Sequence, residues 1–260
     1  MSMPHSRILE FARQDPAYGK RLAIVVPYRD RLAHLQRFVP HMMDYFARDK
    51  LDRLIDYSIH VVEQLGTERF HRGLLCNAGF LIARDSADYF CFHDVDYLPI
   101  WADYSHPDKP TRLIWHGLVL KEDYERFFGA VVAFSKADFL KVNGFANAFW
   151  GWGPEDLELG LRCKLAGLGF DKRDGTYEAL PHPHAGIGPG GEPTAEAMRN
   201  FERFNSRFEN LKEIYPRDGV NTADFRLVES SKVVVEGRSV ANVFLHKVEL
   251  GKEPAAPATR

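Results

Sequence analysis

Short apolar segments that alternate with helical segments are the feature that most constrains the fold of this chain. Apolar runs at 22–26, 57–64 and 89–93 have the length of buried strands. Between them, 32–48 and 72–86 carry apolar residues at helical spacing. Parallel strands need a long crossover, which is usually a helix. The alternation therefore predicts an α/β fold whose sheet is largely parallel at least at its start.

The second half of the chain alternates in a similar way. We expect a strand at 127–135, helices at 136–144, 154–169 and 194–215, and final strands at 223–230 and 241–250. In the helix at 154–169, four leucines recur at helical spacing and predict its buried face. Since no repeat or long linker interrupts the pattern, we expect one domain over residues 1–250 and a disordered tail over 251–260.

Charge and hydropathy exclude several classes of protein. The 34 Lys and Arg residues nearly balance the 36 Asp and Glu residues, and a formal net charge of −2 argues against a nucleic-acid partner. The sequence shows no apolar stretch near the roughly 20 residues of an integral membrane segment, and no signal peptide. Three cysteines without C-x-x-C spacing favour a reducing compartment. These features predict a cytoplasmic location.

An acidic pair follows the third predicted strand. Asp94 and Asp96 lie in the segment HDVD, where that strand ends. In open α/β sheets, ligands bind at the carboxyl ends of strands. A D-x-D pair at this place can supply oxygen ligands to a cation that bridges a diphosphate. A solvated acidic turn is the alternative, because D-x-D is common by chance.

Two histidines lie between prolines in the segment PHPH. His182 and His184 can project the same way from an extended chain. Imidazole nitrogens with a carboxylate suit Mn²⁺, Co²⁺ or Zn²⁺ better than Mg²⁺. With Asp96, the pair would form a three-ligand site that leaves positions open for phosphate oxygens. Taken alone, the two histidines could equally be surface loop residues.

Three arginines are placed where a nucleotide could bind. Arg29 and Arg31 follow the first predicted strand, and Arg72 begins a predicted helix, whose free N–H groups favour an anion. Each could also be an ordinary surface arginine. The chain has neither a G-x-G-x-x-G nor a G-x-x-x-x-G-K-[ST] motif, so these two phosphate-binding loops are excluded.

The segment FWGWGPEDLELG joins two tryptophans to a run of acids. Glu155 and Asp156 lie in the first turn of a predicted helix, where carboxylates complement the helix dipole. The dipole does not explain why Trp150 and Trp152 precede them. Aromatic faces beside carboxylates commonly hold a sugar, and a carboxylate can accept the proton of an attacking hydroxyl. Glu158 is expected to be only a helix residue.

Together these segments resemble the β-1,4-galactosyltransferase family, which are inverting glycosyltransferases of the GT-A fold. Matching blocks occur in the family's order over residues 22–186: VVPYRDR, FHRGLLCNAGF, FHDVDYLP, FFGAVVAFSKADFLKVNGF, FWGWGPEDLELGLR and PHPH. The H-x-H form is most similar to the branch that adds galactose to xylose. The resemblance implies a Rossmann-like mixed sheet flanked by helices. It also implies metal-dependent transfer of a sugar, expected to be galactose, from a UDP-sugar to a hydroxyl of a saccharide.

The resemblance implies a role for each candidate residue. Asp96, His182 and His184 would bind the metal, expected to be Mn²⁺. Asp156 would be the catalytic base, and Glu155 and Trp152 would bind the acceptor. The nucleotide would contact Pro27, Tyr28, Arg29, Arg31, Phe70, Arg72 and Asp94.

The chain departs from the family pattern at two positions. Leu157 stands where members commonly have the second aspartate of E-D-D, and Ala130 replaces the second glycine of a G-G pair. The missing acid at Leu157 favours one alternative, a non-catalytic UDP-sugar or carbohydrate-binding module on the same fold.

Two other enzyme classes fit less well. A sugar-nucleotide pyrophosphorylase needs a Gly-rich loop after its first strand, where this chain has PYRDRLAHL, and a D-x-D-x-T phosphohydrolase would not have YLP after Asp96. Animal members of the resembled family are anchored in the Golgi by an N-terminal span. Because this sequence shows neither anchor nor stem, we expect a bacterial cytoplasmic relative or a shortened form.

Overall fold

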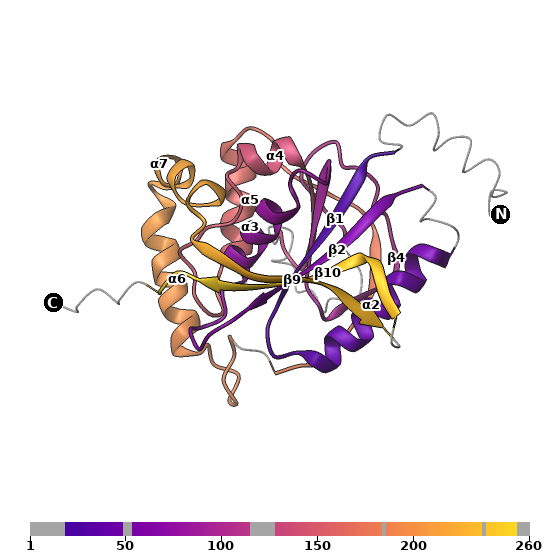
Figure 1. The fold of residues 1–260 in the computed structure, drawn as a ribbon. Coiled ribbons are helices and arrows are strands. Elements are labelled where there is room, and N and C mark those ends of the chain that lie inside the picture. The colour runs from indigo at the N-terminus through magenta and orange to yellow at the C-terminus, as the bar shows by residue number, and fades with distance from the viewer. Residues whose placement is uncertain (1–18, 49–53, 115–127, 184–185, 236–237, 254–260) are drawn as a thin grey trace.

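A computed structural model describes the protein over residues 19–48, 54–114, 128–183, 186–235 and 238–253 (Figure 1). Its main sheet has eight strands in the order β7-β5-β6-β3-β1-β2-β10-β9. At the centre, β1 (Arg21–Tyr28) runs parallel to both β2 (Asp56–Gln64) and β3 (Tyr89–His93). The parallel start that the sequence predicts is therefore confirmed.

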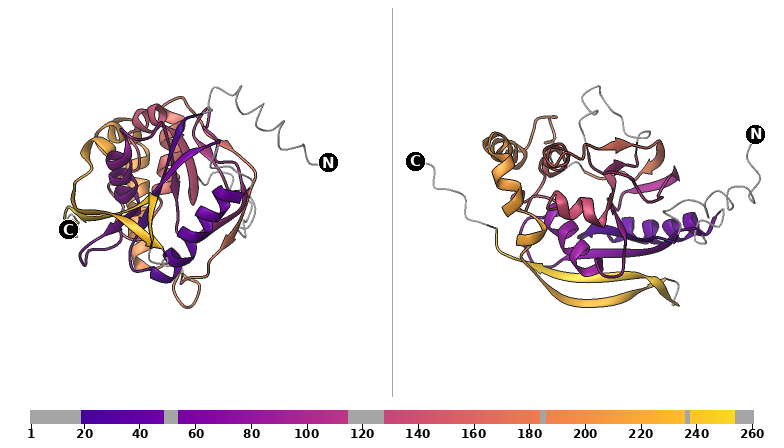
Figure 2. Two further views of the ribbon diagram at one scale, coloured as in Figure 1. Left: turned by 45° about the vertical axis from the view of Figure 1, so that its right-hand side comes forward. Right: turned by 90° about the horizontal axis from the view of Figure 1, so that it is seen from above.

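Antiparallel neighbours make the sheet mixed. β6 (Val131–Ser135) pairs antiparallel with β3, and β9 (Phe225–Val235) pairs antiparallel with β10 (Arg238–Leu250). Figure 2 shows the β9–β10 hairpin along one outer border of the sheet. At the other border lie two short strands, β5 (Thr111–Arg112) and β7 (Asp171–Lys172). A second sheet pairs β4 (Tyr97–Ala102) with β8 (Gly175–Ala179).

Helices cover both faces of the main sheet, because side chains alternate along each strand. Alternate β1 residues such as Ile24 share a buried cluster with α2 (Leu32–Ala47). The intervening residues, such as Val25, share a second cluster with α3 (Arg72–Ala83). The remaining helices are α4 (Lys136–Lys141), α5 (Glu155–Leu165), α6 (Ala195–Phe208) and α7 (Leu211–Ile214), with 3-10 turns at Tyr215–Arg217 and Val220–Thr222.

β1 continues through Pro27, although the sequence predicts that the strand stops there. The pairing between β1 and β3 ends at Val25 and Phe92, so at Pro27 the strand no longer has β3 beside it. The missing N–H of the proline therefore breaks no hydrogen bond to β3.

The buried face of α5 carries charged residues beside the apolar Leu159 and Cys163. The four leucines expected to face inward are half-buried or exposed. Glu158 and Arg162 are instead fully buried, and Arg162 Nη2 donates to Glu158 Oε1 at 2.8 Å. Arg207 of α6 donates to both oxygens of Glu158, at 2.8 and 2.9 Å. The expectation that Glu158 is only a helix residue is therefore wrong, because it joins α5 to α6.

The C-terminal part differs from expectation in two places. The helix predicted at 194–215 is divided into α6 and α7 around Glu209 and Asn210. In the predicted tail, Glu253 accepts a hydrogen bond from Arg69 Nε at 2.9 Å, and residues 254–260 lie outside the described part of the chain.

None of the helices in the described ranges is both long and apolar enough to cross a bilayer.

Candidate active site

The acidic turn after β3 is held between two other segments. Asp94 N–H donates to the carbonyl of Ala130 at 3.0 Å, and the carbonyl of Asp96 accepts from Leu180 N–H at 2.7 Å. Leu180 follows β8, so this contact brings the start of PHPH beside Asp96. Ala130 has a φ of 61°, in the left-handed region that favours glycine. The backbone here thus retains the conformation expected of the glycine that Ala130 replaces.

Arg72 joins three of the predicted site carboxylates. Its Nε donates to Asp94 Oδ1 at 2.6 Å, and its Nη1 donates to Asp156 Oδ1 at 2.7 Å. Glu155 Oε1 lies 3.8 Å from the same Nη1. Asp94 comes from the end of β3, Arg72 begins α3, and Glu155 and Asp156 begin α5. The structure therefore unites residues that the sequence assigns to nucleotide binding and to the acceptor side.

Burial and mutual repulsion disfavour the charged forms of these carboxylates. Burial and the charge of Asp156 together raise the pKa of Glu155 to about 8, against the opposing effect of Arg72. Burial also raises the pKa of Asp94 to about 7, against the effect of Arg72. The pKa of Asp156 is raised by burial too, with Arg72 again opposing. This arrangement therefore favours the protonated form of Glu155.

Two buried atoms of this cluster lack a hydrogen-bond partner within the described ranges. They are Glu155 Oε2 and Arg72 Nη2. A buried polar atom without a partner typically costs about 1–3 kcal/mol. Such atoms call for a specific explanation, and a bound ligand that supplies the missing partners is one.

A second cluster joins Asp96 to the first histidine of PHPH. His182 Nε2 lies 2.6 Å from Asp96 Oδ2. On the other side of the ring, His182 Nδ1 lies 2.8 Å from the carbonyl of Pro183 and 3.2 Å from Arg31 Nη2. The shorter contact favours an N–H at Nδ1 that donates to Pro183. The lone pair of Nε2 then faces the carboxylate of Asp96.

This arrangement fits a metal centre. Two electron-pair donors that face each other at 2.6 Å need a proton or a cation between them. Metal-binding histidines typically donate their other N–H to a backbone carbonyl, as His182 does to Pro183. His184 lies outside the described residues. Among the residues that are described, no group of three or more His, Cys, Asp or Glu side chains converges on one point.

The remaining residues predicted to bind the nucleotide lie at or just after the end of β1, or in the segment before α3. The Arg29 guanidinium lies over the ring of Phe70, 5.6 Å from its centroid, and Nη1 donates to the carbonyl of Glu68 at 2.5 Å. Pro27 and Tyr28 end β1, and Tyr28 is buried in the cluster that α2 covers. The structure pairs Arg29 with Phe70, and it places Arg31 in the cluster of Asp96 and His182.

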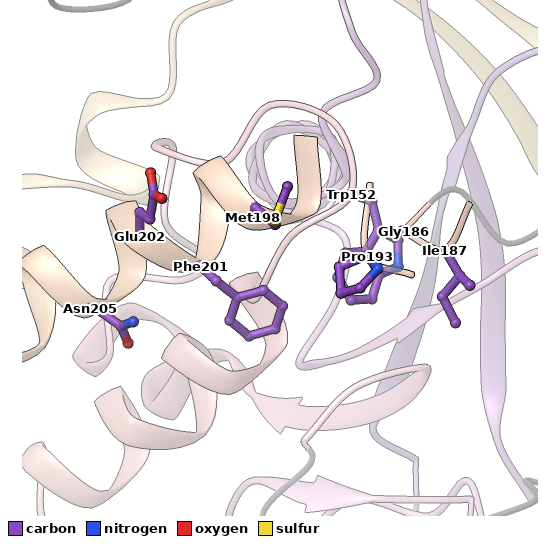
Figure 3. A pocket seen from close by; sticks show the side chains of 8 residues that line it. All are labelled: Trp152, Gly186, Ile187, Pro193, Met198, Phe201, Glu202 and Asn205. Carbon is purple, nitrogen blue, oxygen red and sulfur yellow. The ribbon is translucent and has the colours of Figure 1, made fainter. Parts of the chain in front are cut away.

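Trp152 forms one wall of an apolar groove. The groove has a volume of about 420 Å³ and is lined by Trp152, Gly186, Ile187, Pro193, Met198, Phe201, Glu202 and Asn205. Figure 3 shows Met198 and Phe201 on the side of α6 that faces Trp152 and Pro193. A Cβ added to Gly186 would lie 2.4 Å from the indole, so the ring packs closely against that backbone. Two of the lining residues, Gly186 and Ile187, follow shortly after the candidate metal-binding segment PHPH in the sequence.

Two residues that the sequence analysis does not single out contact the Trp152 segment. Glu196 Oε1 accepts from Trp152 N–H at 2.7 Å, and Asn200 Nδ2 donates to the carbonyl of Trp152 at 2.8 Å. Both lie on α6, more than 40 residues along the chain. Their spacing of four residues shows that they share a helix face, but it does not show what that face contacts.

Comparisons with known proteins agree with this fold. A profile for the N-terminal region of glycosyl transferase group 7 matches residues 9–105, and one for the N-terminal domain of galactosyltransferase matches residues 115–185. β-1,4-Galactosyltransferase 7 of mouse and of human are each 33% identical over 245 residues, 91% of this chain and 71% of theirs. Human β-1,4-galactosyltransferase 5 is 37% identical over 178 residues, 64% of this chain and 44% of its own.

Solved structures resemble the fold as well. The catalytic domain of Drosophila β1,4-galactosyltransferase 7 in complex with xylobiose has a TM-score of 0.70 at 24% identity, covering 90% of this chain and 95% of that one. A variant of the same enzyme, in complex with manganese, UDP-Gal and xylobiose, has a TM-score of 0.68 at 25% identity and the same coverage.

The fold is that of a GT-A glycosyltransferase, as the sequence predicts. Its relatives make the assignment narrower. The chain belongs to the β-1,4-galactosyltransferase family, and it is a sugar-transferring enzyme of that kind.

The cytoplasmic location expected from the sequence is wrong. That expectation depends on the lack of a leader or an anchor, but the matched relatives are animal galactosyltransferases, which the family resemblance places in the Golgi. The chain also covers only 59% of the hamster β-1,4-galactosyltransferase 4 and 44% of the mouse β-1,4-galactosyltransferase 5. Where this sequence begins is therefore no guide to location.

Proposed function

We propose that this chain transfers galactose from UDP-galactose to a hydroxyl of a xyloside or related saccharide, inverting the anomeric carbon. The observation that carries the proposal is the bridge that Arg72 makes between Asp94 and Asp156. The guanidinium of Arg72 thereby connects Asp94, a predicted nucleotide contact, with Asp156, the candidate base. The Drosophila enzyme solved with UDP-Gal and xylobiose supports the choice of donor and acceptor.

Asp156 is proposed as the base. It accepts the proton of the acceptor hydroxyl while that oxygen attacks the anomeric carbon, from the face opposite the departing diphosphate. Arg72 Nη1, 2.7 Å from Asp156 Oδ1, favours the ionised carboxylate and so opposes the effect of burial. Proton transfer to a positioned base typically contributes about 10²- to 10⁴-fold to a rate.

Glu155 and Trp152 are proposed to hold the acceptor. Because burial favours the protonated form of Glu155, its carboxyl can donate a hydrogen bond to an acceptor oxygen. Its Oε2 atom is buried and has no partner among the described residues. Trp152 supplies an aromatic face beside the groove, on which a sugar ring can stack. Leu157, in place of the family's second aspartate, leaves one fewer polar contact to the acceptor.

Mn²⁺ is proposed as the metal, held by Asp96, His182 and His184. The facing Nε2 and Oδ2 atoms of His182 and Asp96 support two of these ligands, and the Drosophila structure contains manganese. When bound, such an ion withdraws negative charge from the departing diphosphate.

The nucleotide is proposed to contact the residues around the ends of β1 and β3. Arg29, held over Phe70, and Arg31, beside His182, would supply positive charge to the diphosphate. The full set comprises Pro27, Tyr28, Arg29, Arg31, Phe70, Arg72 and Asp94.

A donor screen tests the proposal. The protein is incubated with Mn²⁺ and, separately, UDP-galactose, UDP-N-acetylgalactosamine and UDP-glucose, and the release of UDP is measured with and without a xyloside. We expect release from UDP-galactose to increase when the xyloside is present. Metal-dependent UDP binding without release from any donor would support the non-catalytic binding module instead.

A further inference from the structure

The polar face of α6 is turned toward the segment that carries Trp152. Glu196, Asn200, Arg203 and Arg207 are spaced at i, i+4, i+7 and i+11, so they form one stripe along the helix. Buried helix faces in soluble proteins are usually apolar. Here the side chains of the stripe contact the backbone of residues 148–153 and the start of α5, whereas the apolar Met198 and Phe201 line the groove beside the Trp152 indole.

The contacts are directed at backbone atoms. Asn200 Nδ2 donates to the carbonyls of Trp150 and Trp152, at 2.9 and 2.8 Å, and its residue is 3% exposed. Glu196 Oε1 accepts from Trp152 N–H at 2.7 Å. Arg203 Nη1 donates to the carbonyl of Ala148 at 2.5 Å. Because the backbone supplies these partners, the contacts do not depend on the side-chain groups of Ala148, Trp150 or Trp152.

The glycines of the W-G-W-G motif make this approach possible. A Cβ added to Gly151 would lie 2.1 Å from the carboxyl carbon of Glu196, and one added to Gly153 would lie 3.0 Å from Asn200 Nδ2. Gly151 also has a φ of 78°, which disfavours any other residue. The motif therefore fits α6 closely at both glycines.

The other oxygen of Glu196 extends the contact away from the site. Arg69 Nη1 lies 3.3 Å from Glu196 Oε2, and Arg69 also pairs with Glu253. Just beyond Arg69, the carbonyl of Phe70 accepts from Gly151 N–H at 2.7 Å. The Trp152 segment is thus held from both sides.

We propose that Asn200 and Glu196 are positioning residues for sugar transfer. They fix the backbone from Trp150 to Gly153, and thereby the direction of the Trp152 indole and the start of α5 at Glu155. The catalytic consequence rests on the function proposed above, but the structural role does not. Neither residue contacts the carboxylates bridged by Arg72 or the Asp96–His182 pair, so donor binding should be independent of both.

Asn200→Asp is the sharpest single change, because it keeps the shape of the side chain but removes the N–H groups and places a carboxylate against two carbonyls. Asn210→Asp, the same change at an exposed position just beyond α6, is the matched control. We expect Asn200→Asp to raise the KM for the xyloside about tenfold, since small misplacements at a site have large effects. The affinity for UDP with Mn²⁺ should stay within about twofold of wild type, and Asn210→Asp should match wild type in both.

Hydrogen exchange tests the backbone contact without any turnover. Glu196→Gln keeps an oxygen that can accept from Trp152 N–H, whereas Glu196→Ala does not. We expect exchange in the peptide containing Trp152 to be about tenfold faster in Glu196→Ala than in wild type, and to be near wild type in Glu196→Gln.

Equal exchange in wild type and Glu196→Ala would overturn the proposed hold on the backbone. Faster exchange in Asn200→Asp with an unchanged acceptor KM would overturn the positioning role. A wild type that transfers no sugar from any donor would instead contradict the proposed function, while the exchange comparison would still decide whether α6 holds the segment.

Discussion

Arg72 Nη1 lies 2.7 Å from Asp156 Oδ1, although 84 residues separate the two along the chain. The same guanidinium donates to Asp94 through Nε at 2.6 Å. Buried carboxylates of like charge repel each other, and here a single cation keeps them together. The candidate base is therefore held against α3 and oriented by the same residue that contacts the end of β3.

Arg72→Lys should disrupt this bridge. Lysine keeps the charge but lacks the planar fork that reaches two carboxylates at once. We expect the free energy of unfolding, measured by urea denaturation, to fall by about 1–3 kcal/mol, and UDP release to fall with it. Arg84→Lys, exposed at the other end of α3, is the matched control and should change stability by less than about 0.5 kcal/mol. A lysine variant as stable and active as wild type would show that the fork is dispensable.

Asp96→Ala and His182→Ala should each abolish metal-dependent binding of UDP. Each removes one of the two facing donor atoms, and a site with fewer ligands binds its ion more weakly. Calorimetry with UDP, with and without Mn²⁺, measures this directly. Asp103→Ala, which removes a carboxylate that pairs with Arg173 instead, is the control for charge. Unchanged Mn²⁺-dependent affinity in both site variants would contradict the metal centre.

The described part of the chain also contains a buried histidine pair that should make stability depend on pH. His60 Nδ1 lies 3.0 Å from His246 Nε2, and Ser58 and Ser230 contact the outer nitrogens at 2.9 Å. Burial, together with the charge of His246, lowers the pKa of His60 to about 4. The folded protein therefore binds fewer protons than the unfolded chain, so stability present above about pH 6.5 is lost as the pH falls toward 4.

His60→Asn removes this titrating group. We expect wild type to lose about 1.5 kcal/mol more stability than His60→Asn between pH 6.5 and about pH 5, by urea denaturation at each pH. His34→Asn, at a half-buried histidine of α2, should retain the slope of wild type. Identical slopes for wild type and His60→Asn would show that the pair does not set the pH dependence.

Glu158→Gln should destabilise the junction of α5 and α6. Glu158 is fully buried between Arg162 and Arg207, and the change leaves both guanidinium groups without its charge. Removing one partner of a buried ion pair typically costs about 3–5 kcal/mol. Thermal and urea unfolding would show the loss, with Glu209→Gln at the exposed end of α6 as the control. A loss no larger than that of the control would contradict a structural role for the buried pair.

Local patterns in the sequence account for the first strands and helices, because each depends on its own apolar spacing. β3 is predicted with the ends that the structure shows, Tyr89 and His93. Such local patterns do not predict ion pairs between different elements. The leucines of α5 predict an apolar buried face. Glu158 is paired with cations on its own helix and on α6, so it is buried together with the apolar Leu159 and Cys163.

The candidate site is predictable in parts and not in its assembly. Asp94 and Asp96 follow a strand, and in open α/β sheets ligands bind at the carboxyl ends of strands. The bridge from Arg72 to Asp156 joins two helices that are far apart in the sequence, and no residue spacing in the sequence predicts it. Glu196 and Asn200 contact backbone atoms, so their partners leave no pattern of side chains to recognise.

The most direct test of the account is Asp156→Asn, assayed for both transfer and binding. The amide keeps the shape of the side chain but cannot accept the proton of the acceptor hydroxyl. We expect turnover of UDP-galactose with a xyloside to fall by about 10²- to 10⁴-fold, while the affinity for UDP with Mn²⁺ stays within about twofold of wild type. Asp138→Asn, in the first turn of α4, is the matched control and should leave both unchanged. Near-normal turnover by Asp156→Asn would contradict the assignment of the base.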